Sequence, residues 1–365
     1  MSRRKGRRER RDLKRNKNNK EYKIGDIANN SVLYESFKLS SKGVMFKESV
    51  QRYRLNVFFK NYELKQKMLN DKDVRQGLIE FVRNDRGKPR NISSIHFSER
   101  IAQTAVCRFI LQPRFFKTLI KENSASQKGK GTLFAAKLLE KHLREFYKKH
   151  DSGYILLIDF KKYFENIDHG KVLEFYDKYF KDEILKNLCK RFVTIYPKGL
   201  GLGSEVSQFN AIIYLNKIDH YIKSNFKYYG RYMDDSYIIS ENKEELENFL
   251  EELKILYSDL KIVLNEKKTM IIPLNQHFTF LKTRHKITES KKIIKKPCRS
   301  CIVRERRRLK RQLKLVLKGI LNISHIKISV ASWKGSMLHR HARKSVYEVE
   351  KIFNDFIKTM EEDKK

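Results

Sequence analysis

The clearest hydrophobic pattern in the chain is a short continuous apolar run, residues 153–158, which ends in Asp159. An uninterrupted run of this length is typical of a strand that is buried on both faces. Residues 228–240 place two further acids, Asp234 and Asp235, between two β-prone segments, which predicts a hairpin with both acids at its turn. The three carboxylates can therefore meet if these strands are neighbours in an antiparallel sheet.

Helical periodicity dominates most of the remaining chain. The stretch from Ile92 to Gln103 runs into a predicted helix, in which Ile101, Ala105, Val106 and Phe109 recur at three-to-four spacing and indicate one buried face. Residues 171–194, 211–222 and 244–257 are also predicted to be helical, and 262–264 and 270–273 to be short strands. Glycine, proline and basic residues predict turns or loops at 83–90, 126–132 and 199–204.

The last ninety residues differ from the rest because they are basic and their pattern is mainly helical. Leu309, Leu313 and Val316 lie on one face of a segment that is otherwise rich in arginine and lysine. This change of character indicates a separate helical domain at the end of the chain.

The net charge says more about the partner of this protein than the rest of the composition does. The 365 residues include 81 Lys and Arg against 43 Asp and Glu, a formal net charge of +38. Such an excess indicates a polyanionic partner, most simply nucleic acid, although a basic balance alone also fits a ribosome-associated or membrane-surface protein. Residues 3–20 are predicted to be an arm that binds phosphate, the alternative being a solubilising tail. Its candidate contacts are Arg3, Arg4, Arg7 and Arg8.

Neither a membrane span nor a secretory signal is predicted, because no stretch approaches about 20 uninterrupted apolar residues. We therefore expect a cytoplasmic protein. Among the four cysteines, Cys298 and Cys301 form a close pair, but no second half of a zinc site accompanies them. Reduced, structural thiols are the simpler interpretation. His339 and His341 are expected to touch RNA or to pack locally.

The acids supply the candidate chemistry. Nucleotidyl transfer uses metal ions to neutralise the attacking and leaving oxygens, and a two-metal site holds them about 3.5–4 Å apart on shared carboxylates. Hard ions such as Mg²⁺ prefer oxygen ligands. Nothing in the sequence supplies a positioned base for water, so a nuclease or phosphodiesterase is the weaker interpretation of the acids.

Three ordered motifs carry a resemblance to a known family. The segment Tyr232 to Asp235 resembles the YxDD signature of reverse transcriptases, residues 159–164 resemble the strand with the first aspartate, and residues 200–208 resemble the family's third motif. The resemblance runs from roughly Arg83 to Lys282. It implies an α/β (α+β) right-hand polymerase in which fingers and a palm with a central antiparallel sheet precede a helical thumb.

The resemblance also implies domain boundaries. Residues 1–25 would be the basic arm, 26–150 the fingers, 151–275 the palm and 276–365 the helical thumb. A fingers insertion would occupy about 172–199. Phe278 to Lys282 resembles the primer-grip turn, with Lys282 in place of the family's usual glycine.

Catalytic roles follow from the same resemblance. Asp159, Asp234 and Asp235 would be the catalytic carboxylates and would bind two Mg²⁺ ions, for which Mn²⁺ can substitute. The backbone of Phe160 would complete one ligand shell. Lys268 resembles the palm lysine that protonates the pyrophosphate leaving group, although the adjacent lysine competes for that role.

The substrate contacts are likewise implied. Lys88 and Arg90 resemble the fingers residues that grip the triphosphate of the incoming deoxynucleotide. Phe164 falls at the sugar gate, where an aromatic ring clashes with a ribose 2′-hydroxyl; the alternative is a core phenylalanine. The nucleotide pocket would also include Leu202, Gly203, Ser207 and Gln208. Candidate nucleic-acid contacts are Lys128, Lys130, Arg306, Arg307, Arg311 and Trp333, of which Trp333 is either a stacking platform or a core residue.

The third motif departs from the commonest form of the family. Leu202-Gly203 and Ser207-Gln208 stand where many reverse transcriptases have Pro-Gln-Gly and Ser-Pro. This form resembles bacterial enzymes of antiviral defence systems and of diversity-generating retroelements. Because Leu202 cannot make the hydrogen bond of a glutamine, we hypothesise relaxed fidelity.

The expected function is therefore RNA-directed synthesis of cDNA from deoxynucleotides, on an associated structured noncoding RNA, in a bacterial antiviral defence system. A second protein of the same operon and self-association are further expected partners. The alternatives are an error-prone enzyme of a diversity-generating retroelement, a template-independent or protein-primed DNA polymerase, and an RNA-binding splicing cofactor on the same fold. Retention of all three aspartates favours catalysis over the last.

Overall fold

The central sheet of the protein has four antiparallel strands, in the order β4-β5-β3-β6. The computed structural model describes residues 20–85 and 88–362. The strands are β3 (Tyr154–Ile158), β4 (Tyr228–Tyr232), β5 (Asp235–Ser240) and β6 (Met270–Pro273). The apolar run that ends at Asp159 is therefore an inner strand, paired with β5 on one side and β6 on the other, as its continuous hydrophobicity predicts.

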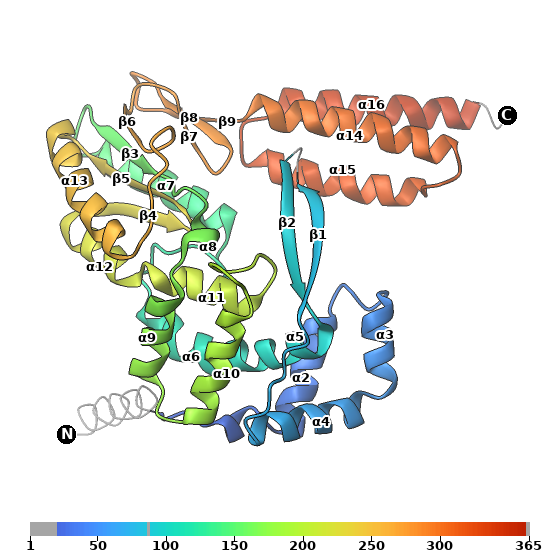
Figure 1. Ribbon diagram of the computed structural model, residues 1–365. Helices are drawn as coiled ribbons and strands as arrows, with labels where there is room; N and C mark the ends of the chain where they lie inside the picture. Colours follow the sequence, from blue (N-terminus) through green and yellow to red (C-terminus); the bar gives the residue numbers. More distant parts are fainter. Residues whose placement is uncertain (1–19, 86–87, 363–365) are drawn as a thin grey trace, which may run out of the picture.

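Helices cover this sheet and continue beyond it as a second layer (Figure 1). Their shared core includes residues of β3, β4 and β5 together with the buried faces of the helices. The helices that follow β3 are α8 (Tyr163–Asn166), α9 (His169–Tyr179), α10 (Glu183–Thr194), α11 (Glu205–Tyr214), α12 (Asn216–Asn225) and α13 (Lys243–Asp259). The predicted helix 171–194 is thus two helices, because Asp182 starts a new one by accepting a hydrogen bond from the backbone N–H of Leu185.

A long two-stranded hairpin rises from the N-terminal helices. Residues 83–90 were predicted as a turn, and they include the adjoining ends of β1 (Leu78–Asp85) and β2 (Lys88–Ile95). Helical structure begins at Phe97, and Ile101, Ala105 and Val106 of the predicted helix are buried. The surrounding elements are η1 (Ile24–Asp26), α2 (Asn30–Ser41), α3 (Glu48–Leu55), α4 (Val57–Leu69), α5 (Phe97–Val106), the π-helix η2 (Cys107–Leu111), α6 (Gln112–Phe115), η3 (Phe116–Thr118) and α7 (Thr132–Phe146).

The C-terminal part begins with a small sheet and ends in three helices. The sheet is β7 (Phe278–Phe280), β8 (Thr283–Ile287) and β9 (Ile293–Pro297), and the helices are α14 (Arg299–Leu317), α15 (Ile323–Leu338) and α16 (Arg343–Glu362). The helical segment predicted from residue 276 therefore starts at Arg299. In β8 every second side chain is buried, which is the alternation of a strand with one solvated face.

The three C-terminal helices have a core of their own, formed around Leu309, Ile326 and Val349. In Figure 1 they form a separate bundle, joined to the rest of the chain through β9. The basic, mainly helical end of the chain is thus a three-helix bundle in the structure. None of the described helices is long and apolar enough to cross a lipid bilayer.

Candidate active site

The register of β3 and β5 brings two of the predicted acids face to face. Ile158 pairs with Ser236, so Asp159, one residue beyond the end of β3, lies opposite Asp235, the first residue of β5. Directly opposed residues of antiparallel strands have Cβ atoms about 4.5–5.5 Å apart. Asp234 occupies the two-residue turn between β4 and β5, beside Met233, whose φ is +56°. The predicted hairpin with acids at its turn is confirmed.

Asp159 is buried and is held by two residues of the loop that precedes β6. The Nζ of Lys268 lies 2.7 Å from its Oδ2, and the Nδ2 of Asn265 donates to its Oδ1 at 2.8 Å. The backbone N–H of Asn265 also donates to the carbonyl oxygen of Asp159 at 2.8 Å. The expected strand at 262–264 is reduced to a single bridge between Phe160 and Leu264. The loop therefore fixes Asp159 through both its side chain and its main chain.

Electrostatics distinguishes Asp235 from its neighbours. Burial, followed by the charges of Asp234 and Asp159, raises the pKa of Asp235 from 3.8 to about 7. Burial would lower the pKa of Lys268, but its hydrogen bond with Asp159 and the charges of all three acids raise it instead. The charges of Lys268 and Lys282 act in the opposite direction on Asp235 but do not cancel the effect of burial and of the neighbouring acids.

These groups fit divalent cations on the chemistry of the donor set. As the side chains stand, no three His, Cys, Asp or Glu residues of the described chain are gathered as a metal-holding group. However, the ammonium group of Lys268 already lies at an oxygen of Asp159, and a bound cation would oppose the effect of burial and of the neighbouring acids that raises the pKa of Asp235. Carboxylate oxygens of Asp159, Asp234 and Asp235 are the ligands that Mg²⁺ prefers.

A buried ion pair supports the turn that carries Asp234. The guanidinium of Arg231 donates to both carboxylate oxygens of Asp219, from Nε at 2.7 Å and from an Nη at 2.6 Å. The same group donates to the carbonyl oxygens of Met233 at 2.9 Å and Ile212 at 2.8 Å. The hydroxyl of Tyr229 donates to Asp219 at 2.6 Å. Arg231 thus ties the turn that carries Asp234 to two helices.

The glycine-containing loop 199–204 packs against the segment that follows Asp159. The N–H of Leu200 donates to the carbonyl oxygen of Phe164 at 2.7 Å. Gly199 has a φ of +60°, and a Cβ there would lie 2.5 Å from main-chain atoms of residue 165, so only glycine fits. Ser204 begins α11 by accepting from the N–H of Ser207, and its own hydroxyl donates to Gln103 of α5.

The predicted nucleotide-pocket residues lie on or beside this loop. Leu202 and Gln208 are half-buried, Gly203 is exposed and Ser207 is buried. Phe164 is half-buried and meets Tyr163 edge-on, with ring centroids 5.9 Å apart. Lys88 and Arg90 belong to β2, and their side chains lie outside the described part of the structure.

The predicted nucleic-acid contacts are divided among several places. Lys128 is exposed, whereas the ammonium group of Lys130 donates to the carbonyl oxygens of Lys121 and Asn123 at 3.0 and 2.7 Å. Lys130 therefore holds its own loop together. The arm residues Arg3, Arg4, Arg7 and Arg8 lie outside the described residues.

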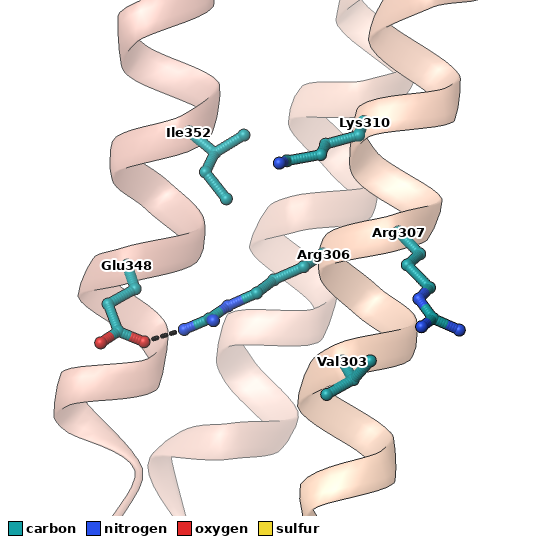
Figure 2. Close-up of a pocket in the computed structure, with 6 residues that line it drawn as sticks. All are labelled: Val303, Arg306, Arg307, Lys310, Glu348 and Ile352. Carbon is teal, nitrogen blue, oxygen red and sulfur yellow. Dashed lines mark hydrogen bonds and ion pairs between the residues drawn. The ribbon is translucent and has the colours of Figure 1, made fainter.

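The C-terminal bundle presents a basic groove of about 440 Å³ between α14 and α16. Figure 2 shows Arg306 directed across it to Glu348, with which it forms an ion pair, while Arg307 and Lys310 line the same groove. Arg311, one turn along α14, is exposed. Trp333 is half-buried against two apolar clusters of the bundle. This packing favours the core interpretation of that side chain.

Sequence reasoning missed Arg231, Asp219 and Asn265. Asn265 stands three residues before Lys268, so its place beside a candidate site was visible, but its hydrogen bond to Asp159 was not. Arg231 adjoins the YxDD motif, although nothing in the pattern indicates that its charge is buried and paired. All four cysteines are free thiols, and Cys107 and Cys189 are buried.

Comparison with known proteins assigns the family. The family described as reverse transcriptase (RNA-dependent DNA polymerase) matches residues 81–285, more than half of the chain. The chain therefore belongs to the reverse transcriptase family, and its fold of helices with antiparallel sheets is that of this family. The predicted enzyme class is thereby confirmed: the domain is that of an RNA-directed DNA polymerase.

One similar solved structure is described as apo telomerase from Candida tropicalis truncated from the C-terminal domain. The two chains are 14% identical with a TM-score of 0.46, over 60% of this chain and 55% of the telomerase chain. This chain thus spans little more than half of that telomerase. No curated protein sequence matches it significantly.

Asp219→Asn should destabilise the fold by about 3–5 kcal/mol, because it leaves the buried guanidinium of Arg231 without its counter-charge. Urea unfolding followed by circular dichroism measures the change. Tyr229→Phe is the matched control, since it removes one hydrogen bond to the same carboxylate and should cost about 1 kcal/mol. Equal effects of the two variants would contradict the assigned role of the ion pair.

Asp235→Asn should stabilise the protein in magnesium-free buffer, in a pH-dependent way. The folded state of the wild type binds a proton at Asp235 up to about pH 7, whereas the ordinary value of 3.8 applies to the unfolded chain. Wild-type stability is therefore lost as the pH rises from about 4 to about 7. The melting temperature of the variant should exceed that of the wild type increasingly over this window and by a constant amount above it. A difference independent of pH would refute the assignment.

Proposed function

We propose that this protein is an RNA-directed DNA polymerase that makes cDNA by two-metal nucleotidyl transfer. The observation that carries the proposal is the juxtaposition of Asp159 and Asp235 on neighbouring strands, with the ammonium group of Lys268 bound to Asp159. Family membership supplies the reaction class, and this geometry supports the choice of residues. A splicing cofactor that only binds RNA would not need these acids.

The proposed chemistry joins the 3′-hydroxyl of a primer to the α-phosphate of a deoxynucleotide and releases pyrophosphate. Bound Mg²⁺ would neutralise charge on the attacking and leaving oxygens. The carboxylates of Asp159, Asp234 and Asp235 would hold it, together with the carbonyl oxygen of Phe160. The hydrogen bond with Asp159 and the charges of the three acids raise the pKa of Lys268, so they hold it in the protonated form that a general acid for the leaving pyrophosphate would require.

The proposed domain layout follows the order of the elements. Residues 26–150, with the β1–β2 hairpin, would be the fingers, and 151–275, with the four-stranded sheet, would be the palm. The α9–α10 pair would be the insertion at about 172–199, and the part after 276 would be the thumb. Arg307, Lys310 and Arg311 on α14 would then lie along the path of the nucleic acid, where exposed cations bind phosphate.

Purified protein, with and without its copurified RNA, should be incubated with each deoxynucleotide, and any product sequenced. We expect cDNA complementary to one defined, structured RNA, and no product from Asp159→Asn or Asp234→Asn. Lys217→Gln, a charge change on α12, is the control and should retain synthesis. Products unrelated to any RNA would instead establish template-independent or protein-primed synthesis, and an inert wild type would overturn the proposal.

Phe164 is proposed to select deoxynucleotides by occupying the space of a ribose 2′-hydroxyl. Phe164→Ala should raise the kcat/KM for ribonucleotides relative to deoxynucleotides by roughly tenfold or more, measured by single-nucleotide extension. Tyr163→Phe is the neighbouring control, because it removes only the hydrogen bond from the tyrosine hydroxyl to the carbonyl oxygen of Ala211. Unchanged sugar selectivity in Phe164→Ala would show that the ring serves packing alone.

The biological role that we propose is antiviral defence in a bacterium, with a second protein of the same operon as partner. Its support is the form of the loop at Leu202-Gly203 and Ser207-Gln208, which resembles such systems. Expression of the operon in a bacterial host should lower phage plaque counts, and Asp234→Asn should abolish the protection. Variable sequence appearing in a neighbouring gene, without protection, would instead indicate a diversity-generating retroelement.

A further inference from the structure

The N-terminal helices have an apolar face that no described part of the chain covers. Helix α4 packs Leu64 and Met68 into the core. On the adjoining face the side chains of Phe58, Phe59 and Tyr62 are 75%, 61% and 52% exposed. Residues three and four apart lie together on a helix surface, so the three rings form one stripe. We call this stripe the aromatic face of α4.

Part of the aromatic face is already ordered by stacking. The ring of Phe58 stacks on Tyr34 of α2, with centroids 5.5 Å apart and planes 16° from parallel. The ammonium group of Lys60 lies 5.7 Å from the centre of the Phe59 ring. Exposed rings held in fixed orientations beside cations are suited to stacking with unpaired bases.

The charge around these rings is strongly positive. Residues 30–69 have eight Lys and Arg side chains and three carboxylates. Each carboxylate is paired within its own helix: Glu35 with Lys38, Glu48 with Arg52 and Glu63 with Lys60. The remaining cations of this segment form no ion pair within the described residues. They are Lys42, Lys47, Arg54, Lys65 and Lys67.

The location of the aromatic face separates it from the catalytic carboxylates. In Figure 1, α3 and α4 lie at the lower edge of the molecule, at the opposite end from the C-terminal bundle and well away from β3 and β5. A ligand on this face would therefore be held outside the polymerising centre. Protein interfaces are enriched in aromatic residues and arginine but depleted in lysine, and four of the five cations beside this face that form no ion pair within the described residues are lysines, which favours a polyanionic partner.

We propose that the aromatic face of α4, with the unpaired lysines and arginines beside it, binds a single-stranded segment of RNA. Bases would stack on Phe58, Phe59 and Tyr62, and phosphates would contact the surrounding cations. The choice of RNA rests on the proposed function, since the family copies RNA templates. The site would anchor the template RNA at a distance from the reaction.

The test measures binding of a labelled single-stranded RNA of roughly 12 nucleotides to the full chain. Excess unlabelled primer–template hybrid occupies the polymerising centre. The triple variant Phe58→Leu, Phe59→Leu and Tyr62→Leu keeps an apolar surface but removes the ring faces. We expect its Kd to be about tenfold higher or more. Ile255→Ala on α13, where the side chain is 67% exposed, is the control and should leave the Kd unchanged.

Two further readouts locate the site. RNA that contains 4-thiouridine should crosslink to residues 42–69 of the wild type, and the crosslink should weaken in the triple variant. Lys65→Gln with Lys67→Gln should lower the salt dependence of binding by about 1.4 in log–log slope. Charge loss and ring loss thus report separately on the two parts of the site.

A Kd within twofold of the wild type in the triple variant, or crosslinks confined to other segments, would overturn the proposal. So would a change of oligomeric state at unchanged RNA affinity, because the face would then dock a protein. Extension of the primer–template hybrid is measured in parallel. A wild type that binds RNA through α4 but extends no primer would refute the proposed function and leave this site standing.

Discussion

The buried ion pair between Arg231 and Asp219 is the interaction on which the geometry of the candidate active site depends. Its two short hydrogen bonds neutralise a charge in the core, and the remaining donors of the guanidinium fix the carbonyl oxygens of Met233 and Ile212. An arginine fork donates in fixed directions, so it specifies positions as well as supplying energy. The turn that presents Asp234 is thereby attached to α11 and α12, and the left-handed backbone of Met233 is held in place.

The candidate catalytic acids differ from this ion pair, because their negative charges are not fully neutralised. Burial and the charges of Asp234 and Asp159 raise the pKa of Asp235, and the ammonium group of Lys268 is bound to Asp159. Such an arrangement lowers stability, and proteins retain it where function requires concentrated charge. Support from Asn265 and from the Arg231 network keeps the carboxylates in place despite this repulsion. The buried core therefore holds together carboxylates that would otherwise move apart because their charges repel one another.

Much of the site was predictable because the signals are local. The apolar run before Asp159 and the hairpin of residues 228–240 are each short and strongly patterned, and both predictions are confirmed. The errors fall where the local signal was weak or mixed. Basic residues obscured the strands of the β1–β2 hairpin, and the basic character of the last ninety residues concealed β7 to β9, although alternate side chains of β7 and β8 are buried. The break at Asp182 depends on a single capping side chain.

The sequence by itself determined the family and hence the enzyme class, and it placed three candidate acids at strand ends, since strand pattern and motif order are properties of contiguous residues. Only the tertiary structure decided that Asp159 faces Asp235, that Lys268 and Asn265 hold Asp159, and that Arg231 is buried against Asp219. It also decided that Lys130 stabilises its own loop and that the rings of α4 remain uncovered. These facts depend on which distant segments pack together. The residues that flank a charged or aromatic side chain in the sequence do not indicate which side chain it will contact in the fold.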